Sequence, residues 1–195
     1  STPPLPTMAE MDKTLALCEK GSMLLPEQLT NVAQFISSCK RIKSYLSKAE
    51  QLNCQLAYYG RSIENLNAVY EEIDRSIRNE VVDDSASSTL RNIRRKIENT
   101  HQQIKSKLES LLRNKKEWFT DGYVSTRNGQ FVLPVKKEYK NHVSGTVIDM
   151  SGTGNTFFIQ PSAVCKLQDE LAYLKIEEDN EIRKILYTLT ALVSE

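Results

Sequence analysis

Apolar residues recur every three or four positions along most of the chain, which is the period of an amphipathic helix. Gly21 and the pair Tyr59-Gly60 are expected to interrupt this helical pattern in the first third of the chain. Seams along 63–77 and 164–192 have the spacing of helices that pack against other helices. Helices are predicted over roughly 8–20, from Pro26 onward, over 63–77, from Ser85 or Ser87 to about 111, and after Pro161.

Between Thr120 and Pro161 the apolar period changes to two, which is typical of β-strands. Asn128-Gly129 lies between two alternating runs, and both residue types tolerate the positive φ of a two-residue hairpin turn. Residues 145–161 repeat the arrangement of strand, glycine-containing turn and strand. We therefore expect a mainly α protein with a small antiparallel β element inserted between helices. Its expected regions are a helical body with a long outgoing helix (1–119), the β element (120–161) and a long helix (162–195).

The stretch SGTGNTFFIQP, residues 151–161, places two glycines among hydroxyl residues, as phosphate-binding loops do. A P-loop needs a lysine and then a serine or threonine after its last glycine, where a helix begins. Here Gly154 is followed by Asn155 and Thr156, and then by aromatic and β-branched residues that favour a strand. The dinucleotide-binding pattern of three glycines is absent too. The stretch is therefore interpreted as a hairpin turn.

Charge is distributed unevenly, although the whole chain carries only +1. Residues 91–116 contain nine basic and two acidic side chains, whereas residues 166–195 contain four basic and seven acidic ones. One end of the molecule is therefore expected to be basic and another acidic.

The four cysteines form no C-x-x-C pair, so we expect reduced thiols in a cytoplasmic protein rather than a zinc site or a disulfide framework. No apolar run has the length of a membrane span, and no signal-peptide pattern is present. The sequence begins with STPPLP and stops at ALVSE within a helical pattern, so we expect a fragment of a longer protein.

The sequence offers no residue set that is typical of catalysis. His101 has no second ligand one helical turn away and is interpreted as a surface or interface residue. The acidic run 177–181 points around a helix, so it is interpreted as a solvated face rather than a metal site. Asp83-Asp84 precedes a helix and is interpreted as a capping pair. We expect no enzyme activity, no cofactor and no metal in this chain.

The best candidates for function are basic and polar residues beside the β element. Lysines that follow the second strand and residues at the neighbouring hairpin turn can contact phosphates without reading bases. Lysines that are only solvated give the same pattern, so the sequence leaves that alternative open. The candidates are Arg127, Asn128, Lys136, Lys137, Lys140, Asn141 and His142.

Several stretches resemble the MutS family. RNGQFVLPVKKEY at 127–139 and GTVIDMSGTGNTFFIQP at 145–161 are similar to its clamp region, in the form found in the bacterial subfamily that carries a C-terminal Smr domain. EKGSMLLPEQL at 19–29 and VVDDSASSTLRNIRRKI at 81–97 resemble the core and lever segments of that subfamily. The resemblance covers nearly the whole chain in the same order. Departures stand at Ile148, Met150 and Gln160, where His, a polar residue and Glu are expected.

The resemblance implies that the chain is the core, lever and clamp part of an ATPase. The motor, with its P-loop and its sites for ATP and Mg²⁺, would follow the chain, and an Smr domain with nuclease activity would follow the motor. It also implies a homodimer formed mainly through the ATPase, and a nucleic-acid partner. That partner is branched or duplex DNA, for suppression of recombination, or ribosomal RNA on collided ribosomes, for ribosome rescue. Mismatch recognition is not implied, because no mismatch-reading domain is visible.

An alternative interpretation remains open. The chain is then a purely structural helical arm whose apolar seams bind partner helices, while its lysines are only solvated. Contact with phosphates alone does not distinguish DNA from ribosomal RNA, because it carries no base code.

Overall fold

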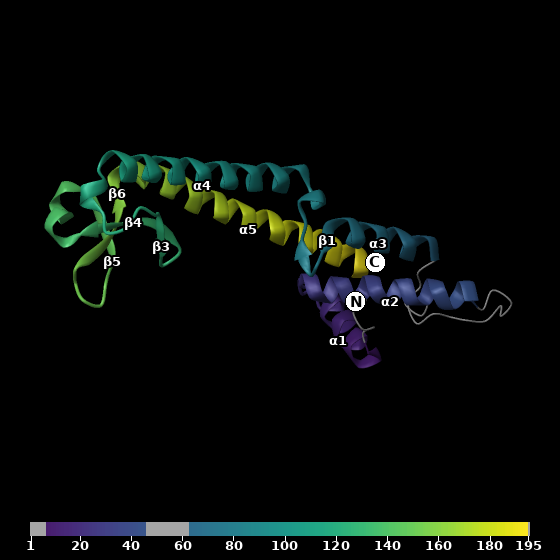
Figure 1. The fold of residues 1–195 in the computed structure, drawn as a ribbon. Helices are drawn as coiled ribbons and strands as arrows, with labels where there is room; N and C mark the ends of the chain where they lie inside the picture. Colours follow the sequence, from purple (N-terminus) through teal and green to yellow (C-terminus); the bar gives the residue numbers. More distant parts are fainter. Residues whose placement is uncertain (1–6, 46–62, 195) are drawn as a thin grey trace. The chain divides into compact units, whose positions relative to one another are not determined.

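The computed structural model describes residues 7–45 and 63–194 (Figure 1). The structure is mainly helical with two small antiparallel sheets, as the sequence predicts. Packing divides the chain into one unit of residues 1–92 and 179–195 and a second unit of residues 93–178. This division by packing differs from the functional regions expected from the sequence, which stay a prediction. The long helices α4 (Ser88–Asn114) and α5 (Cys165–Ser194) contribute residues to both units.

The first unit contains the helices α1 (Met8–Glu19), α2 (Pro26–Tyr45) and α3 (Ile63–Ser76), together with the last part of α5. A reciprocal capping box begins α1, because the Thr7 hydroxyl accepts from the Glu10 amide and the Glu10 carboxylate accepts from the Thr7 amide. The predicted helix start at Pro26 is confirmed. The break predicted at Tyr59-Gly60 lies outside the described residues.

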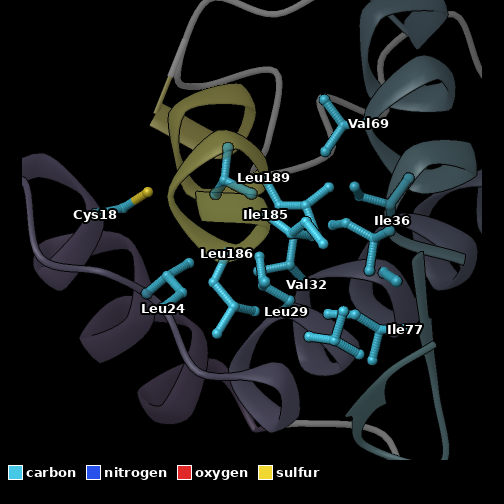
Figure 2. Close-up of a cluster of buried hydrophobic side chains, with 14 of the residues drawn as sticks. Cys18, Leu24, Leu29, Val32, Ile36, Val69, Ile77, Ile185, Leu186 and Leu189 are labelled. Carbon is cyan, nitrogen blue, oxygen red and sulfur yellow. The ribbon is translucent and has the colours of Figure 1, made fainter. Parts of the chain in front are cut away.

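Side chains from these helices meet in one apolar core (Figure 2). Leu29, Val32 and Ile36 have the predicted helical spacing and lie on the buried face of α2. Apolar residues of both predicted seams, such as Ile73 and Leu189, are buried in the same core, so the chain's own helices cover them. Other buried members are Met11, Leu15, Cys18, Leu24, Ala33, Leu66, Val69, Ile77, Val82, Leu90, Ile185, Leu186 and Val193.

A buried polar residue, Thr190 of α5, connects α5 to the segment before α2. Its hydroxyl accepts a hydrogen bond from the Leu24 amide at 3.0 Å and donates one to the Leu186 carbonyl at 2.6 Å. Its carbonyl accepts from the thiol of Cys18 at 3.2 Å. Because Leu24 is completely buried, its amide has no access to water as a substitute partner.

A short hairpin follows α3, and the sequence analysis missed it. The expected seam ran to Ile77, but α3 ends one residue earlier and Ile77 pairs with Val82 across the strands β1 (Ile77–Arg78) and β2 (Val81–Val82). Ile77 thereby reaches the core from a strand instead of a helix.

The turn of this hairpin uses Asn79 and Glu80, with φ of 52° and 60°. Positive φ at both positions is what a two-residue turn with the right-handed strand twist needs. Glutamate is an uncommon residue for that conformation, which explains why the turn carried no sequence signal.

The predicted caps before α4 are confirmed. The Asp83 carboxylate accepts from the Ser85 amide at the start of the 3₁₀ helix η2 (Asp84–Ala86). The Ser87 hydroxyl accepts from the Leu90 amide at 2.9 Å and so caps α4. Thr100, which interrupts the apolar seam of α4, is buried and donates its hydroxyl to the Lys96 carbonyl, so its polar group is satisfied within the helix.

The second unit contains a four-stranded antiparallel sheet in the order β3-β4-β6-β5. The strands are β3 (Ser125–Arg127), β4 (Gln130–Lys136), β5 (Gly145–Met150) and β6 (Thr156–Pro161). Both predicted hairpins are confirmed, and Asn128 and Gly129 have the expected positive φ of 52° and 75°. The sequence did not predict the pairing of β4 with β6, which joins the hairpins into one sheet.

Strand β4 is buried on both faces. Val132, Leu133 and Val135 are completely buried, so its burial does not follow the alternation expected from the sequence. The second core combines strand residues with α4 and α5, and its buried members are Ile104, Leu108, Leu112, Phe119, Leu133, Val135, Ile159, Val164 and Leu171.

The expectation of reduced cysteines holds for only part of the chain that the structure describes. Cys18 is buried and Cys165 is exposed, and both are free thiols. Cys39 is disulfide-bonded, so the expectation is wrong for that residue. Among the helices of residues 7–45 and 63–194, none has both the length and the apolar character needed to cross a membrane.

Substituting Thr190→Val is expected to lower the free energy of unfolding by about 1–3 kcal/mol, because it leaves the buried Leu24 amide without an acceptor. Urea denaturation would measure this loss. Thr188→Val is the matched control, since Thr188 is exposed and its hydroxyl donates only to Lys184 of the same helix. Equal losses for the two variants would contradict the role assigned to Thr190.

Substituting Gly145→Ala is expected to cost about 1–3 kcal/mol, because the new Cβ would lie 2.1 Å from the backbone carbonyl oxygen of Gln160 in β6. Gly152→Ala in the neighbouring turn provides the control, since its Cβ would meet nothing within 4 Å. Thermal unfolding of both variants compares the two sites. A Gly145→Ala protein as stable as Gly152→Ala would show that β5 and β6 are not so closely apposed.

Candidate nucleic-acid interface

The candidate lysines lie where β4 continues into the 3₁₀ helix η4 (Lys137–His142). Lys136 is paired with Thr156 in the register of β4 and β6, and the Lys137 amide donates to the Asn155 carbonyl at 3.0 Å. The sheet thus holds the backbone of this segment in place. Lys137 and Lys140 are exposed, as a contact with phosphates requires, and Lys136 is half-buried.

An aromatic ring lies under the charged group of Lys140. The Nζ of Lys140 is 4.7 Å from the ring centroid of Phe157 in β6. The ring's negative face attracts the ammonium group and limits the positions of a long, flexible side chain. Lys140 therefore presents its charge from a restricted region of the surface.

His142 lies at the end of the 3₁₀ helix that residues 137–142 form. Its ring centroid lies 5.5 Å from that of Trp118 and 5.2 Å from that of Tyr139. His142 thus belongs to an aromatic group, and Asn141 next to it is exposed.

Arg127 and Asn128 lie at the other end of β4 from the lysines. Arg127 pairs with Gln130, and Gln130 lies six positions before Lys136 along β4. This spacing corresponds to about 20 Å at the rise of a strand. The structure therefore does not bring all seven candidates together. It places them in two groups, one at each end of β4.

Arg127 also has contacts within the sheet. Its guanidinium carbon lies 4.1 Å from the ring centroid of Phe158, and its Nε lies 3.6 Å from Oδ2 of Asp149. Both side chains of this ion pair are nearly half exposed, so the pair itself contributes little to stability. The guanidinium also stacks on the buried Phe158, which gives Arg127 a structural role in the sheet as well.

The sequence analysis missed a second basic and aromatic group, directly after α4. Trp118 ends the 3₁₀ helix η3 (Lys116–Trp118), and the Nζ of Lys115 lies 5.3 Å from its ring centroid. The available signal was a lysine pair close to the only tryptophan of the chain. Its proximity to His142 depends on the folded sheet and was not visible in the sequence.

Two acidic residues that were expected to be solvated are in fact paired. The Glu178 carboxylate accepts from Nε of Arg94 at 3.1 Å, and within the first unit the Glu181 carboxylate accepts from the Ser87 hydroxyl at 3.1 Å. These contacts connect residues of α5 to α4 and its cap. His101 packs its ring edge-on against Phe131 at 5.7 Å, which confirms an interface position.

Within the described residues, no group of three or more histidine, cysteine or acidic side chains is arranged to hold a metal ion. The described part of the chain is thus mainly helical, and its second unit carries a basic and aromatic surface.

Comparison with known proteins finds relatives of this chain. The chain is 35% identical over 195 residues to a protein named Endonuclease MutS2 from Clostridium botulinum type A, covering 98% of the chain and 25% of the relative. It is 34% identical over 197 residues to a protein of the same name from Clostridium beijerinckii, with the same coverage. No family model matches the chain.

The chain is therefore related to proteins named Endonuclease MutS2 and spans about a quarter of their length. This confirms the resemblance to the MutS family at the level of that relationship. The assignment of the chain to core, lever and clamp regions stays a prediction.

Substituting Arg127→Lys is expected to lower stability by about 0.5–1 kcal/mol, because it keeps the charge but loses the planar group that stacks on Phe158. Arg113→Lys is the control at an exposed position of α4, where the change is expected to be near zero. Denaturant titration of both variants measures the difference. Equal stability of the two variants would contradict the structural role of Arg127.

Proposed function

We propose that the chain is the core, lever and clamp region of a MutS-like protein, and that its second unit binds the phosphate backbone of nucleic acid. The observation that carries this proposal is the arrangement of Lys136, Lys137 and Lys140 on a segment whose backbone is held by β6. Asn141 and His142 lie beside these lysines and add polar contacts. Arg127 and Asn128 form a secondary contact at the other end of β4.

The local charge supports the proposal. Between residues 113 and 142 there are seven basic and three acidic side chains, a net charge of +4 in a chain whose total is +1. Lysine and arginine that neutralise phosphates release counterions, which provides affinity without sequence preference. A protein that binds by this means follows the shape of a nucleic acid and not its base sequence.

The parent protein is proposed to be an ATPase that binds ATP and Mg²⁺ outside this chain, dimerises through that part, and acts in the cytoplasm. A nuclease activity, which the name of the relatives states for them, is proposed to lie in an Smr domain. The role proposed for this chain is binding of nucleic acid, and the catalytic steps are proposed to lie in other parts of the parent protein.

Two partners fit the same phosphate-binding surface. Branched DNA corresponds to suppression of recombination, and ribosomal RNA of a collided ribosome corresponds to rescue of that ribosome. Both expose closely spaced phosphates at junctions of helices, and the lysine segment contains no residue set that reads bases.

A structural arm is the second candidate function. The expectation that the apolar seams bind partner helices is weakened, because residues of both seams are buried in the chain's own cores. One observation still favours it, since Tyr173 and Ile176 lie three positions apart on α5 and are 63% and 58% exposed. Such a pair suits contact with a partner protein.

The test is binding of duplex DNA, branched DNA and structured RNA, measured by fluorescence anisotropy over a series of salt concentrations. Substituting Lys136, Lys137 and Lys140 with Gln is expected to weaken binding of all sequences alike. It should also reduce the salt slope by about 2.7, from the loss of three phosphate contacts.

The matched control replaces three exposed lysines of the first unit, Lys13, Lys20 and Lys184, with Gln. It changes the net charge by the same amount and should leave affinity nearly unchanged. Equal weakening by both triple variants would mean that total charge, and not the η4 segment, determines binding. No binding of any nucleic acid at low salt would reject the function and favour the structural arm.

A further inference from the structure

An open hollow of about 200 Å³ lies beside the lysine segment, within the second unit. Trp118 and His142 line it together with the apolar side chains of Leu111 and Val143. The hydroxyls of Ser144 and Ser162 lie 3.2 Å apart among the lining residues. The hollow thus combines aromatic and apolar walls with hydrogen-bonding groups.

The aromatic lining is accessible. His142 is exposed and Trp118 is half-buried, and their ring centroids are 5.5 Å apart at an angle of 51°. The Nζ of Lys115 lies 5.3 Å from the Trp118 ring, and Lys116 is the exposed next residue. Cations therefore adjoin an aromatic hollow, which is the combination that binds single-stranded nucleic acid.

We infer that the hollow binds one unpaired base of a nucleic-acid strand, stacked on Trp118 and His142. This inference rests on the proposed nucleic-acid function and adds a second kind of contact to it. The lysines hold phosphates of either paired or unpaired strands, whereas the hollow accepts only a base that has left its helix. The chain would then prefer junctions, bulges and strand ends.

The size of the hollow and the charge near it favour this occupant. Pockets for drug-sized molecules usually have about 300–1,000 Å³, so the hollow suits a smaller flat group such as a single base. A base in a strand is flanked by phosphates, and Lys115, with its Nζ 5.3 Å from the Trp118 ring centroid, is placed to neutralise one of them. An apolar peptide side chain would not use this cation.

The serine pair gives the hollow a fixed polar part. The Ser162 amide donates to the Ser144 carbonyl at 2.8 Å, which holds the two residues together where β5 and β6 meet. Their exposed hydroxyls bond to each other, and each keeps further hydrogen-bonding capacity for the edge of a base or its sugar. Because hydroxyls both donate and accept, they tolerate any base.

Trp118 is the only tryptophan of the chain, so its emission reports directly on the hollow. The protein is titrated with oligothymidylate, with oligouridylate and with a blunt duplex that has the same number of phosphates. Quenching that saturates with the unpaired strands, and stays small with the duplex although anisotropy shows the duplex bound, is the expected result. The DNA and RNA strands together show whether the hollow distinguishes the two sugars.

Trp118→Ala is expected to weaken binding of the unpaired strands roughly tenfold and to leave duplex binding unchanged. Trp118→Phe keeps a stacking ring and should restore most of the lost affinity, which separates stacking from a general loss of structure. Tyr123→Ala is the control, since Tyr123 is 78% exposed and is not among the residues that line the hollow.

The two proposals fail differently. Binding of the duplex with unchanged tryptophan emission for all strands, or equal affinity of wild type and Trp118→Ala for unpaired strands, overturns the base-binding hollow and leaves the lysine surface intact. Absence of binding to duplex and unpaired strands alike overturns both proposals.

Discussion

The pairing of β4 with β6 is the interaction on which the proposed nucleic-acid surface depends. Each strand belongs to a local hairpin, and the register that sets Leu133 opposite Ile159 joins the hairpins into one sheet. Both residues are buried in a core to which α4 contributes Ile104 and Leu108. This pairing also brings Lys136 opposite Thr156 and Phe157 close to Lys140. A shift of this register by one residue would separate Leu133 from Ile159 and turn the side chains of β6 to the other face of the sheet relative to β4.

Two different physical contacts meet at this end of the sheet. The proposed lysine contact acts through charge, which salt weakens, and the proposed base contact at Trp118 acts through stacking, which salt affects much less. A surface with both can associate rapidly through its charge and then dwell where a base is available. Arg127 shows the opposite use of a positive charge, because its planar group is engaged within the sheet on Phe158.

The sequence predicted the parts of the structure that depend on neighbours in the chain. Asn128-Gly129 specified its hairpin, Ser87 its helix cap, and the spacing of Leu29, Val32 and Ile36 the buried face of α2. It failed where a contact joins distant residues. The proximity of Trp118 to His142 depends on sheet pairing, and the turn at Glu80 adopts a conformation that glutamate rarely signals.

The first unit is assembled from two stretches of chain that lie on either side of residues 93–178. The core of this unit is completed by Leu186, Leu189 and Val193. The apolar faces of α1, α2 and α3 are therefore not fully buried until those residues have been synthesised. At about 5–20 residues per second, synthesis of the intervening stretch takes on the order of ten seconds. The second unit is contiguous, and the last buried residue of its core, Leu171, is synthesised before Ile185 of the first unit's core. The apolar faces of α1, α2 and α3 therefore stay partly uncovered in a nascent chain until residues 185–193 have been added, which leaves them open to chaperones in the meantime.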